Sequence, residues 1–214
     1  MKCAIVPVTP YQQNCSILIC EKTNKAALVD PGGDLDKIEQ TLKELGVSLE
    51  LILLTHGHMD HCAVADDVRQ KYAVKIEGPH IDDRFWIEQL PQMCEMSGFP
   101  RAESFVPDRW LSCGDTVAVG SHTLEVKHCP GHTPGHVIFF SPESKLAIVG
   151  DVLFKGSIGR TDFPMGNHEQ LITSIREKLW PLGDDVSFIP GHGPTSTFGV
   201  ERRTNPFVAD ANYR

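Results

Sequence analysis

The sequence predicts a mixed α/β fold, in which short apolar strands alternate with amphipathic helices. Apolar runs of about four to eight residues recur along the chain and end at glycine, proline or aspartate, as buried strands do. Between several of these runs the apolar residues have the spacing of a helix that buries one face. No internal repeat and no low-complexity linker divides the sequence, so we expect one domain over residues 1–214.

The first part of the chain is expected to form strands that are separated by two helices. The strands are predicted over residues 2–8, 14–20, 26–30, 51–54 and 74–77. The first helix lies between Asp34, a candidate N-cap, and Gly46, a candidate C-cap. Its apolar residues have helical spacing: Leu35, Ile38, Leu42 and Leu45. The second helix is predicted from about Cys62 to Lys71.

The second part of the chain predicts more strands after one weakly patterned segment. Within residues 79–108, apolar positions indicate one helix that either covers a cleft or belongs to the core: Trp86, Leu90, Met93 and Met96. Strands are then expected over residues 116–119, 123–128, 136–141 and 147–149. A helix from about His168 to Trp180 and a last strand over residues 186–189 complete the pattern.

The composition disfavours several functional classes. The chain has 20 Lys and Arg against 28 Asp and Glu, a net charge of −8, and no basic run that would bind nucleic acid. The N-terminus lacks the apolar core of a secretory leader, and no apolar run approaches membrane-spanning length. The seven cysteines include no C-x-x-C pair. We therefore expect a reduced, cytoplasmic protein without a membrane partner, and the sequence leaves its oligomeric state open.

A cluster of potential metal ligands follows the fourth expected strand. Six consecutive positions contain His56, His58, Asp60 and His61. Side chains two apart in an extended segment point the same way, so His56 and His58 can bind one ion from one side. Asp60 and His61 lie where the chain turns into the next helix, and they point elsewhere. Because neutral imidazole and carboxylate are the usual ligands of zinc and similar ions, the cluster predicts a site for two metals.

Three further candidate ligands follow other apolar runs, each beside a glycine: His132, Asp151 and His192. Glycine lets the backbone approach such a site closely. We group His56, His58 and His132 around one ion. We group Asp60, His61 and His192 around the other, with Asp151 bridging both because a carboxylate has two oxygens. Each ion then keeps room for a shared water, and an open position of this kind is typical of catalytic metal sites.

The other histidines and acids have less specific interpretations. His136 either orients a metal ligand or is a packed strand residue. Four histidines are interpreted as surface or structural residues: His80, His122, His128 and His168. Three aspartates are interpreted as helix caps or solvated charges: Asp30, Asp66 and Asp67.

The motif THGHMDH, together with His132, Asp151 and His192, resembles the metallo-β-lactamase superfamily. The resemblance runs from the first strand to about His192. It implies a four-layer αβ/βα sandwich with the metal ions at the edges of the sheets. It does not specify a substrate, because the superfamily hosts many reactions.

Narrower motifs resemble the glyoxalase II branch of that superfamily: GHTPGH at 131–136, GDVLF at 150–154 and GRTDFP at 159–164. This branch hydrolyses S-acylglutathione thioesters, including S-lactoylglutathione, which gives lactate and glutathione in methylglyoxal detoxification. The resemblance places Arg160 against the glutathione backbone. Asp162 departs from the pattern, since the longer enzymes carry an aromatic residue there. We expect the short bacterial type, because Glu201–Phe207 is similar to its ending and the C-terminal helical domain of the longer enzymes is missing.

The resemblance implies metal-assisted thioester hydrolysis. Two divalent ions, most simply zinc, with iron or manganese as alternatives, activate the shared water and stabilise the developing oxyanion. Asp60 is the expected catalytic carboxylate, because it accepts a hydrogen bond from that water while binding the second ion. Arg160 has an alternative structural role, in which it pairs with an acid such as Asp162 or Glu169.

A competing function is persulfide oxidation. Persulfide dioxygenases resemble this chain in their THxHxDH motif and in a GRTDF loop, and they bind one iron through two histidines and one aspartate. The corresponding residues are His56, His132 and Asp151. Their substrate is glutathione persulfide, and the ligand residues alone do not separate the two functions.

Overall fold

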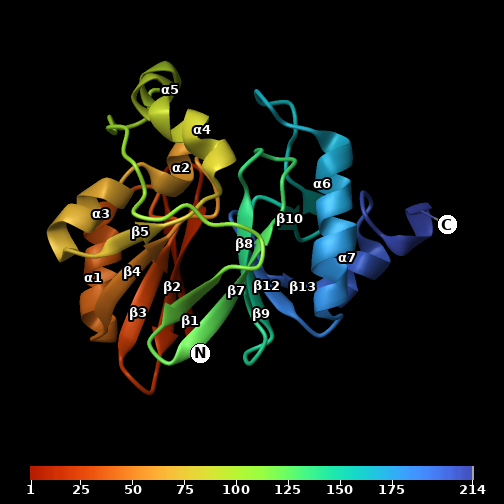
Figure 1. The fold of residues 1–214 in the computed structure, drawn as a ribbon, viewed down its shortest axis with the longest axis horizontal. Coiled ribbons are helices and arrows are strands. Elements are labelled where there is room, and N and C mark those ends of the chain that lie inside the picture. The colour runs from red at the N-terminus through yellow and green to blue at the C-terminus, as the bar shows by residue number, and fades with distance from the viewer. Residues whose placement is uncertain (214) are drawn as a thin grey trace.

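Two β-sheets pack against each other between outer helices in the computed structural model, which describes residues 1–213 (Figure 1). The first sheet has the strand order β1-β2-β3-β4-β5. Its strands are β1 (Lys2–Val8), β2 (Gln13–Cys20), β3 (Lys25–Val29), β4 (Ser48–Leu53) and β5 (Lys75–Glu77). The pairs β1–β2 and β2–β3 are antiparallel, whereas β3–β4 and β4–β5 are parallel.

The second sheet has the strand order β13-β12-β9-β8-β7-β6. Its strands are β6 (Thr116–Val119), β7 (His122–His128), β8 (Val137–Ser141), β9 (Leu146–Gly150), β12 (Ser187–Pro190) and β13 (Ser196–Thr197). Only the β9–β12 pair of this sheet is parallel among the described residues. A separate hairpin joins β10 (Leu153–Phe154) to β11 (Ser157–Ile158).

Helices occupy the outer layers and the rim of the sandwich. Those of the first half are α1 (Leu35–Leu45), α2 (Met59–Cys62), α3 (Ala65–Tyr72), α4 (Arg84–Glu88) and α5 (Leu90–Ser97), with the short turn η1 (Ile81–Asp83). Those of the second half are α6 (His168–Ser174) and α7 (Phe198–Thr204). The π-helical segment η2 (Ile175–Leu179) continues α6, and the segments η3 (Trp180–Leu182) and η4 (Asp210–Tyr213) are short 3-10 turns. No helix among residues 1–213 has the length and apolar character needed to cross a bilayer.

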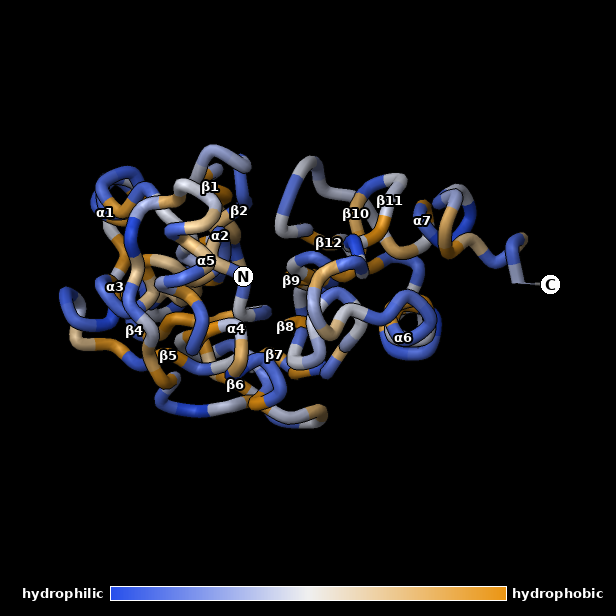
Figure 2. Tube along the Cα trace, turned by 90° about the horizontal axis from the view of Figure 1, so that it is seen from above, coloured by the Kyte–Doolittle hydropathy of each residue, from blue (hydrophilic) through white to orange (hydrophobic). Residues whose placement is uncertain are grey.

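Three apolar clusters hold the four layers together. Leu53 and Phe139 belong to the cluster between the two sheets. Ile38 of α1 packs in the cluster on the outer face of the first sheet, and Leu171 of α6 packs in the corresponding cluster on the second. The faces of α1 and α6 that point away from the sheets are hydrophilic (Figure 2). This arrangement confirms the predicted αβ/βα sandwich.

Several predicted helices have different bounds in the structure. The helix expected through Trp86 and Met96 is divided into α4 and α5, with Pro91 near the start of α5. Proline lacks an amide hydrogen and fits the first turn of a helix better than its interior. The helix expected from Cys62 begins as α3 at Ala65, because the metal-ligand cluster forms the separate short helix α2.

Asp34 precedes α1 as predicted, but its side chain does not cap the helix. Its backbone has a left-handed conformation with φ of 48°, and its carboxylate accepts a hydrogen bond from the Thr9 backbone nitrogen at 2.9 Å. The prediction of the C-cap is confirmed, since Gly46 ends α1 with φ of 64°. The carboxylate of Asp34 therefore ties α1 to the end of β1, a contact that a local sequence pattern does not contain.

Candidate metal centre

All seven predicted metal ligands lie at one end of the paired sheets, where strands stop and loops begin. The first sheet contributes four ligands, from the loop after β4 and from α2: His56, His58, Asp60 and His61. The second sheet contributes three ligands, from positions beyond the ends of β7, β9 and β12: His132, Asp151 and His192. Both sheets therefore contribute ligands to the centre.

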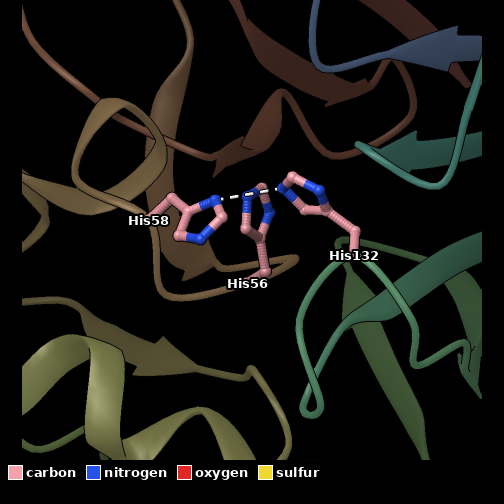
Figure 3. A group of neighbouring side chains, drawn as sticks. All are labelled: His56, His58 and His132. Atoms are coloured by element: carbon pink, nitrogen blue, oxygen red, sulfur yellow. Dashed lines mark hydrogen bonds between the residues drawn. The ribbon is translucent and has the colours of Figure 1, made fainter. Parts of the chain in front are cut away.

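The first predicted group is brought together as expected. Candidate ligand atoms of His56, His58 and His132 all lie within 4.8 Å of one another. Figure 3 shows the three rings converging, with a dashed line between Nδ1 of His58 and Nε2 of His132, which are 3.0 Å apart. Since an imidazole nitrogen lacking a proton is a metal ligand, this triad offers one face of a coordination site.

The second predicted group also converges. Candidate ligand atoms of Asp60, His61 and His192 lie within 4.8 Å of one another. The Nε2 atom of His192 is 3.2 Å from Oδ2 of Asp60, and the Nε2 atom of His61 is 3.8 Å from the same oxygen. Ligands of one zinc ion at about 2.1 Å in a tetrahedron are about 3.4 Å apart, so these separations fit a shared ion.

Asp151 lies between the two groups. Its Oδ1 atom is 3.4 Å from Nε2 of His61, and its Oδ2 atom is 3.6 Å from Nε2 of His132. Its Oδ2 atom is also 3.7 Å from Nε2 of His192. One carboxylate thus faces histidines of both groups, which is the position that a bridging ligand requires.

Four histidines of the centre are oriented through their Nδ1 atoms. His56 donates to the Thr55 hydroxyl at 3.0 Å, and His61 donates to the Asp30 carboxylate at 2.9 Å. His132 donates to the Arg160 carbonyl at 2.7 Å, and His192 donates to the Tyr11 carbonyl at 3.2 Å. Because each Nδ1 carries the proton, each Nε2 keeps a lone pair for a metal ion.

Several polar atoms of the centre are buried without a hydrogen-bond partner in the described chain. They are Nε2 of His56, Nε2 of His61 and Oδ1 of Asp151. Buried polar atoms are almost always paired, because leaving one unpaired costs about 1–3 kcal/mol. These atoms point to metal coordination, so the residues fit the divalent ions expected from the sequence.

The electrostatics also favour cations. Burial lowers the pKa of His56 and of His58 well below the usual value, so both rings are neutral and able to bind a metal. Burial alone would raise the pKa of Asp151, but the neighbouring His61 and His132 lower that pKa far below its usual range. The neighbouring carboxylates of Asp151 and Asp60 raise the pKa of His61 against the effect of burial, so this side of the centre also favours a positive charge. The centre therefore combines the neutral imidazoles of His56 and His58 with an ionised carboxylate.

The predicted close approach of glycine to the site is confirmed at Gly191. A Cβ atom there would lie 2.0 Å from Oδ1 of Asp151 and 2.6 Å from the ring of His61. No larger residue fits this position without displacing both ligands.

The sequence interpretation of Asp30 was wrong. Asp30 is neither a helix cap nor a solvated charge, because its side chain is buried at the end of β3. Its carboxylate accepts hydrogen bonds from the Thr55 amide at 2.7 Å and from the Thr55 hydroxyl at 2.6 Å, in addition to the bond from His61. Asp30 stands at the end of a predicted strand, as the predicted ligands do, and this position was the sequence signal for a role at the centre.

Asp83 was missed altogether. It is fully buried, and it accepts hydrogen bonds from the Gly57 amide at 2.9 Å, the Thr133 hydroxyl at 2.8 Å and the Gly135 amide at 2.5 Å. Burial raises the pKa of Asp83 to about 7, against the effect of these three donors. Asp83 therefore connects the two loops that carry His56, His58 and His132.

His136 lies behind the centre and belongs to neither ligand group. Its Nε2 atom accepts a hydrogen bond from the Asp151 amide at 3.0 Å. Its ring stacks on that of His56, with the ring centres 4.6 Å apart. Of the two roles left open, these contacts are those of a residue that orients ligands.

A cavity of about 630 Å³ opens beside the centre. Its wall is largely apolar and includes Trp86, Met93, Phe154 and Phe163. Helices α4 and α5 line it, so the segment that the sequence left open covers a cleft. The predicted substrate residue Arg160 also lines the cavity, and its guanidinium lies over the Phe163 ring.

Arg160 is paired in the structure. Its Nε and one terminal nitrogen donate to the two carboxylate oxygens of Asp162, each at 2.6 Å. Both side chains are exposed, so the pair lies at the solvent side of the cavity. The structural pairing considered for Arg160 is thus present in a residue that also lines the cavity.

Comparisons with known proteins identify the family of this chain. Residues 8–192 match the family model of the metallo-beta-lactamase superfamily. The hydroxyacylglutathione hydrolase GloC of Haemophilus influenzae is 46% identical over 209 residues, which cover 97% of this chain and 98% of the relative. This relative supports the resemblance to the glyoxalase II branch.

Solved structures share the fold. The B3 metallo-beta-lactamase BLEG-1 matches with a TM-score of 0.89 and 34% identity, covering 97% of this chain and 99% of that one. TTHA1623 in a di-iron-bound form matches with a TM-score of 0.87 and 32% identity, covering 95% and 99%. ETHE1 from Myxococcus xanthus matches with a TM-score of 0.81 and 25% identity, covering 98% and 85%. The chain therefore belongs to the metallo-beta-lactamase superfamily and is a metal-binding hydrolase.

Proposed function

We propose that this enzyme hydrolyses S-acylglutathione thioesters, such as S-lactoylglutathione, at a centre of two metal ions. The observation that carries the proposal is Asp151, whose carboxylate faces His61, His132 and His192 from two separate ligand groups. The name of the Haemophilus influenzae relative, hydroxyacylglutathione hydrolase, supports the substrate class. The products would be a carboxylic acid and glutathione, as in methylglyoxal detoxification.

The ligand roles follow the two groups. We assign His56, His58 and His132 to one ion, Asp60, His61 and His192 to the other, and Asp151 to both. Zinc is the simplest choice for these donors, and the di-iron form of TTHA1623 keeps iron as an alternative beside manganese. When bound there, two divalent ions would supply an activated water and a Lewis acid for the acyl carbonyl.

Asp60 is the proposed catalytic carboxylate. Burial opposes its ionisation, but His61 and His192 beside it lower the pKa of its carboxyl. An ionised Asp60 accepts a hydrogen bond from the attacking water and holds that water toward the acyl carbon. The thiolate of glutathione leaves without a strong acid, because a thiol is far more acidic than an alcohol.

The cavity wall positions the substrate. Trp86 and Phe163 pack edge-on against the His58 ring, at 4.5 and 5.0 Å between ring centres, and they shield this side of the centre from water. A drug-sized ligand needs a cavity of about 300–1,000 Å³, so the volume beside the centre suits a tripeptide thioester. We assign Arg160 to contact with the glutathione half.

The test is a comparison of two variants with one control. We expect His58→Ala and Asp151→Asn to lower kcat for S-lactoylglutathione by about a thousandfold or more, because each removes a ligand from the centre. His122→Ala should match the wild type, since His122 pairs with Glu143 on the surface. Loss of the thioester absorbance is the readout. Undiminished turnover in metal-replete His58→Ala would overturn the assignment.

Persulfide oxidation is the second candidate. The match to ETHE1 from Myxococcus xanthus favours it, together with the positions of His56, His132 and Asp151, which suit one iron. Oxygen consumption with glutathione persulfide, measured beside hydrolysis of S-lactoylglutathione, separates the two functions. Oxygen uptake without thioester hydrolysis would transfer the assignment to the dioxygenase.

We also propose that residues 1–214 form one domain and that the enzyme works in the cytoplasm. Side chains of both sheets share one apolar cluster, which supports a single domain. All seven cysteines are free, as expected in a reducing compartment. Limited proteolysis and localisation of a tagged chain test these two points.

A further inference from the structure

A second group of ligand-type side chains lies outside the centre, in and before η1 and at the end of β7. It consists of His80, Asp82 and His128, whose candidate ligand atoms all lie within 4.8 Å of one another. We propose that this group, the peripheral site, binds a further divalent first-row metal ion such as Zn²⁺. Two imidazoles and one carboxylate are donors that such ions prefer, and water completes the coordination.

His128 has the orientation of a metal-binding imidazole. Its Nε2 atom donates a hydrogen bond to the Pro134 carbonyl at 2.8 Å, so Nδ1 keeps a lone pair. Metal-binding histidines almost always anchor their second nitrogen in this way, as His132 does through the Arg160 carbonyl. Burial also lowers the pKa of His128, so the ring is neutral at physiological pH.

His80 and Asp82 present acceptors that face each other. Nδ1 of His80 accepts a hydrogen bond from the Asp82 amide at 3.3 Å, so it lacks a proton there. Oδ2 of Asp82 is 3.2 Å from the same nitrogen. Two acceptors at this separation repel each other unless a positive charge lies beside them, and a metal ion supplies it. A proton on His80 is the alternative source of that charge.

The two imidazole rings are stacked, so one of them turns about its Cβ–Cγ bond when both bind one ion, because a metal ion lies in the plane of each imidazole that holds it. Their centres are 4.2 Å apart and their planes differ by 19°. The side chains of His80 and Asp82 are 20% and 53% exposed, so an ion reaches them from solvent. The Lys178 amine donates to the His128 carbonyl, and its charge makes this site weaker than the central one.

The peripheral site is connected to the central one through the backbone. The His80 amide donates to the Gly135 carbonyl at 3.0 Å, and His128 binds Pro134 in the same loop. Asp83, directly after Asp82, binds the Gly57 and Gly135 amides. An ion held by His80 and His128 therefore lies beside the loop that carries His132, outside the central ligand groups.

The experiment counts zinc ions per chain in the wild type and two variants. In His80→Asn, the asparagine oxygen still caps η1, as the histidine nitrogen does, but the imidazole ligand is lost. In His128→Gln, the amide still donates to the Pro134 carbonyl, but the second imidazole is lost. His122→Asn is the control, because His122 pairs with the Glu143 carboxylate at 2.9 Å and belongs to no ligand group of the described residues.

After equilibrium dialysis against buffered Zn²⁺, we expect the wild type and His122→Asn to bind one more ion per chain than His80→Asn or His128→Gln. The additional ion should bind to either variant about tenfold more weakly or worse. Wild-type ion counts in either variant overturn the proposal, and they are the result expected if a proton on His80 alone offsets Asp82. Melting curves confirm that each variant is folded.

The measured quantity is the difference in zinc ions per chain between the wild type and each variant, so the number of ions at the central site cancels. It therefore remains decisive if S-lactoylglutathione proves not to be a substrate. Failure of the thioester assay contradicts the proposed function, whereas equal ion counts contradict the peripheral site.

Discussion

At the scale of single residues, one hydrogen bond decides which nitrogen of each histidine is free to bind a metal. His61 is the clearest case, because its Nδ1 donates to the buried Asp30 carboxylate and its Nε2 faces Asp60 and Asp151. A free imidazole exchanges its proton between the two nitrogens, and the acceptor selects one tautomer. Orientation of the ring is thus a property of Asp30 as much as of His61.

Asp30→Asn tests this orientation. Asparagine has one side-chain oxygen, so it does not accept all three bonds that Thr55 and His61 donate to Asp30. We expect the affinity for zinc to fall about 10- to 100-fold, as is typical when an outer partner of a ligand is lost. Competition with a coloured chelator measures the affinity. Asp67→Asn, at an exposed position, is the control, and equal affinities in both variants would contradict the role of Asp30.

Asp162 is expected to limit substrate affinity. The hydrogen bond from Arg160 lowers the pKa of Asp162 to about 2, so the pair is ionised at neutral pH. A glutathione carboxylate must therefore compete with Asp162 for the guanidinium.

Asp162→Asn should lower KM for S-lactoylglutathione about fivefold and leave kcat nearly unchanged, because exposed ion pairs have small effects. The matched control is an uncharged thioester with the same acyl group, S-lactoyl-N-acetylcysteamine, for which KM should not change. A higher KM for S-lactoylglutathione would instead mean that Asp162 holds Arg160 in its working position.

At the scale of secondary structure elements, η1 connects parts of the two sheets. Asp83 at its end binds Gly57 in the loop after β4 and Thr133 and Gly135 in the loop between β7 and β8. These loops carry His56, His58 and His132, so one carboxylate sets their relative position.

Asp83→Asn is expected to destabilise the protein by about 2–4 kcal/mol. The NH₂ group of the asparagine would face backbone and hydroxyl donors that now bind the carboxylate, in a fully buried position. Urea denaturation at neutral pH measures this change. Asp67→Asn, which loses an exposed carboxylate, should change the stability by less than about 0.5 kcal/mol. A similarly small change for Asp83→Asn would show that the loops are held in register without it.

Elements with a strong local pattern could be predicted from the sequence. The strand expected over residues 2–8 is β1 without any shift, and α1 lies between the residues predicted for its ends. The ligand groups could also be anticipated, because each ligand follows an apolar run beside a turn. Strands that end together bring such residues to one edge.

Elements that depend on distant contacts could not be predicted. β13 has only two residues, and it exists because β12 pairs with it. Asp82 and Asp83 are adjacent and identical in type, so the sequence does not tell them apart. Asp82 is exposed, whereas the loops that fold around Asp83 bury its carboxylate. The roles of Asp30 and Asp83 come from tertiary structure, so no periodicity in the chain reports them.

At the scale of the whole molecule, the metal centre lies where the two halves of the sandwich meet. His56, His58, Asp60 and His61 come from the first sheet and its α2 helix, whereas His132, Asp151 and His192 come from the second. The apolar cluster between the sheets holds the halves together below this point. Ions bound at the centre would add further links between the two halves, at the end of the sandwich where the cavity opens.

Removal of metal should therefore lower the melting temperature. An ion that binds only the folded chain stabilises it by about 4 kcal/mol when present at a thousand times its Kd, which corresponds to roughly 8–16 °C for a chain of this size. Differential scanning calorimetry with and without EDTA measures the shift, and added zinc should restore it. Asp151→Asn lacks the carboxylate that faces both groups, so its melting temperature should respond much less to EDTA. Equal melting temperatures of the wild type with and without EDTA would mean that the protein packing alone joins the two halves, and that the ligand groups add no strength to the junction.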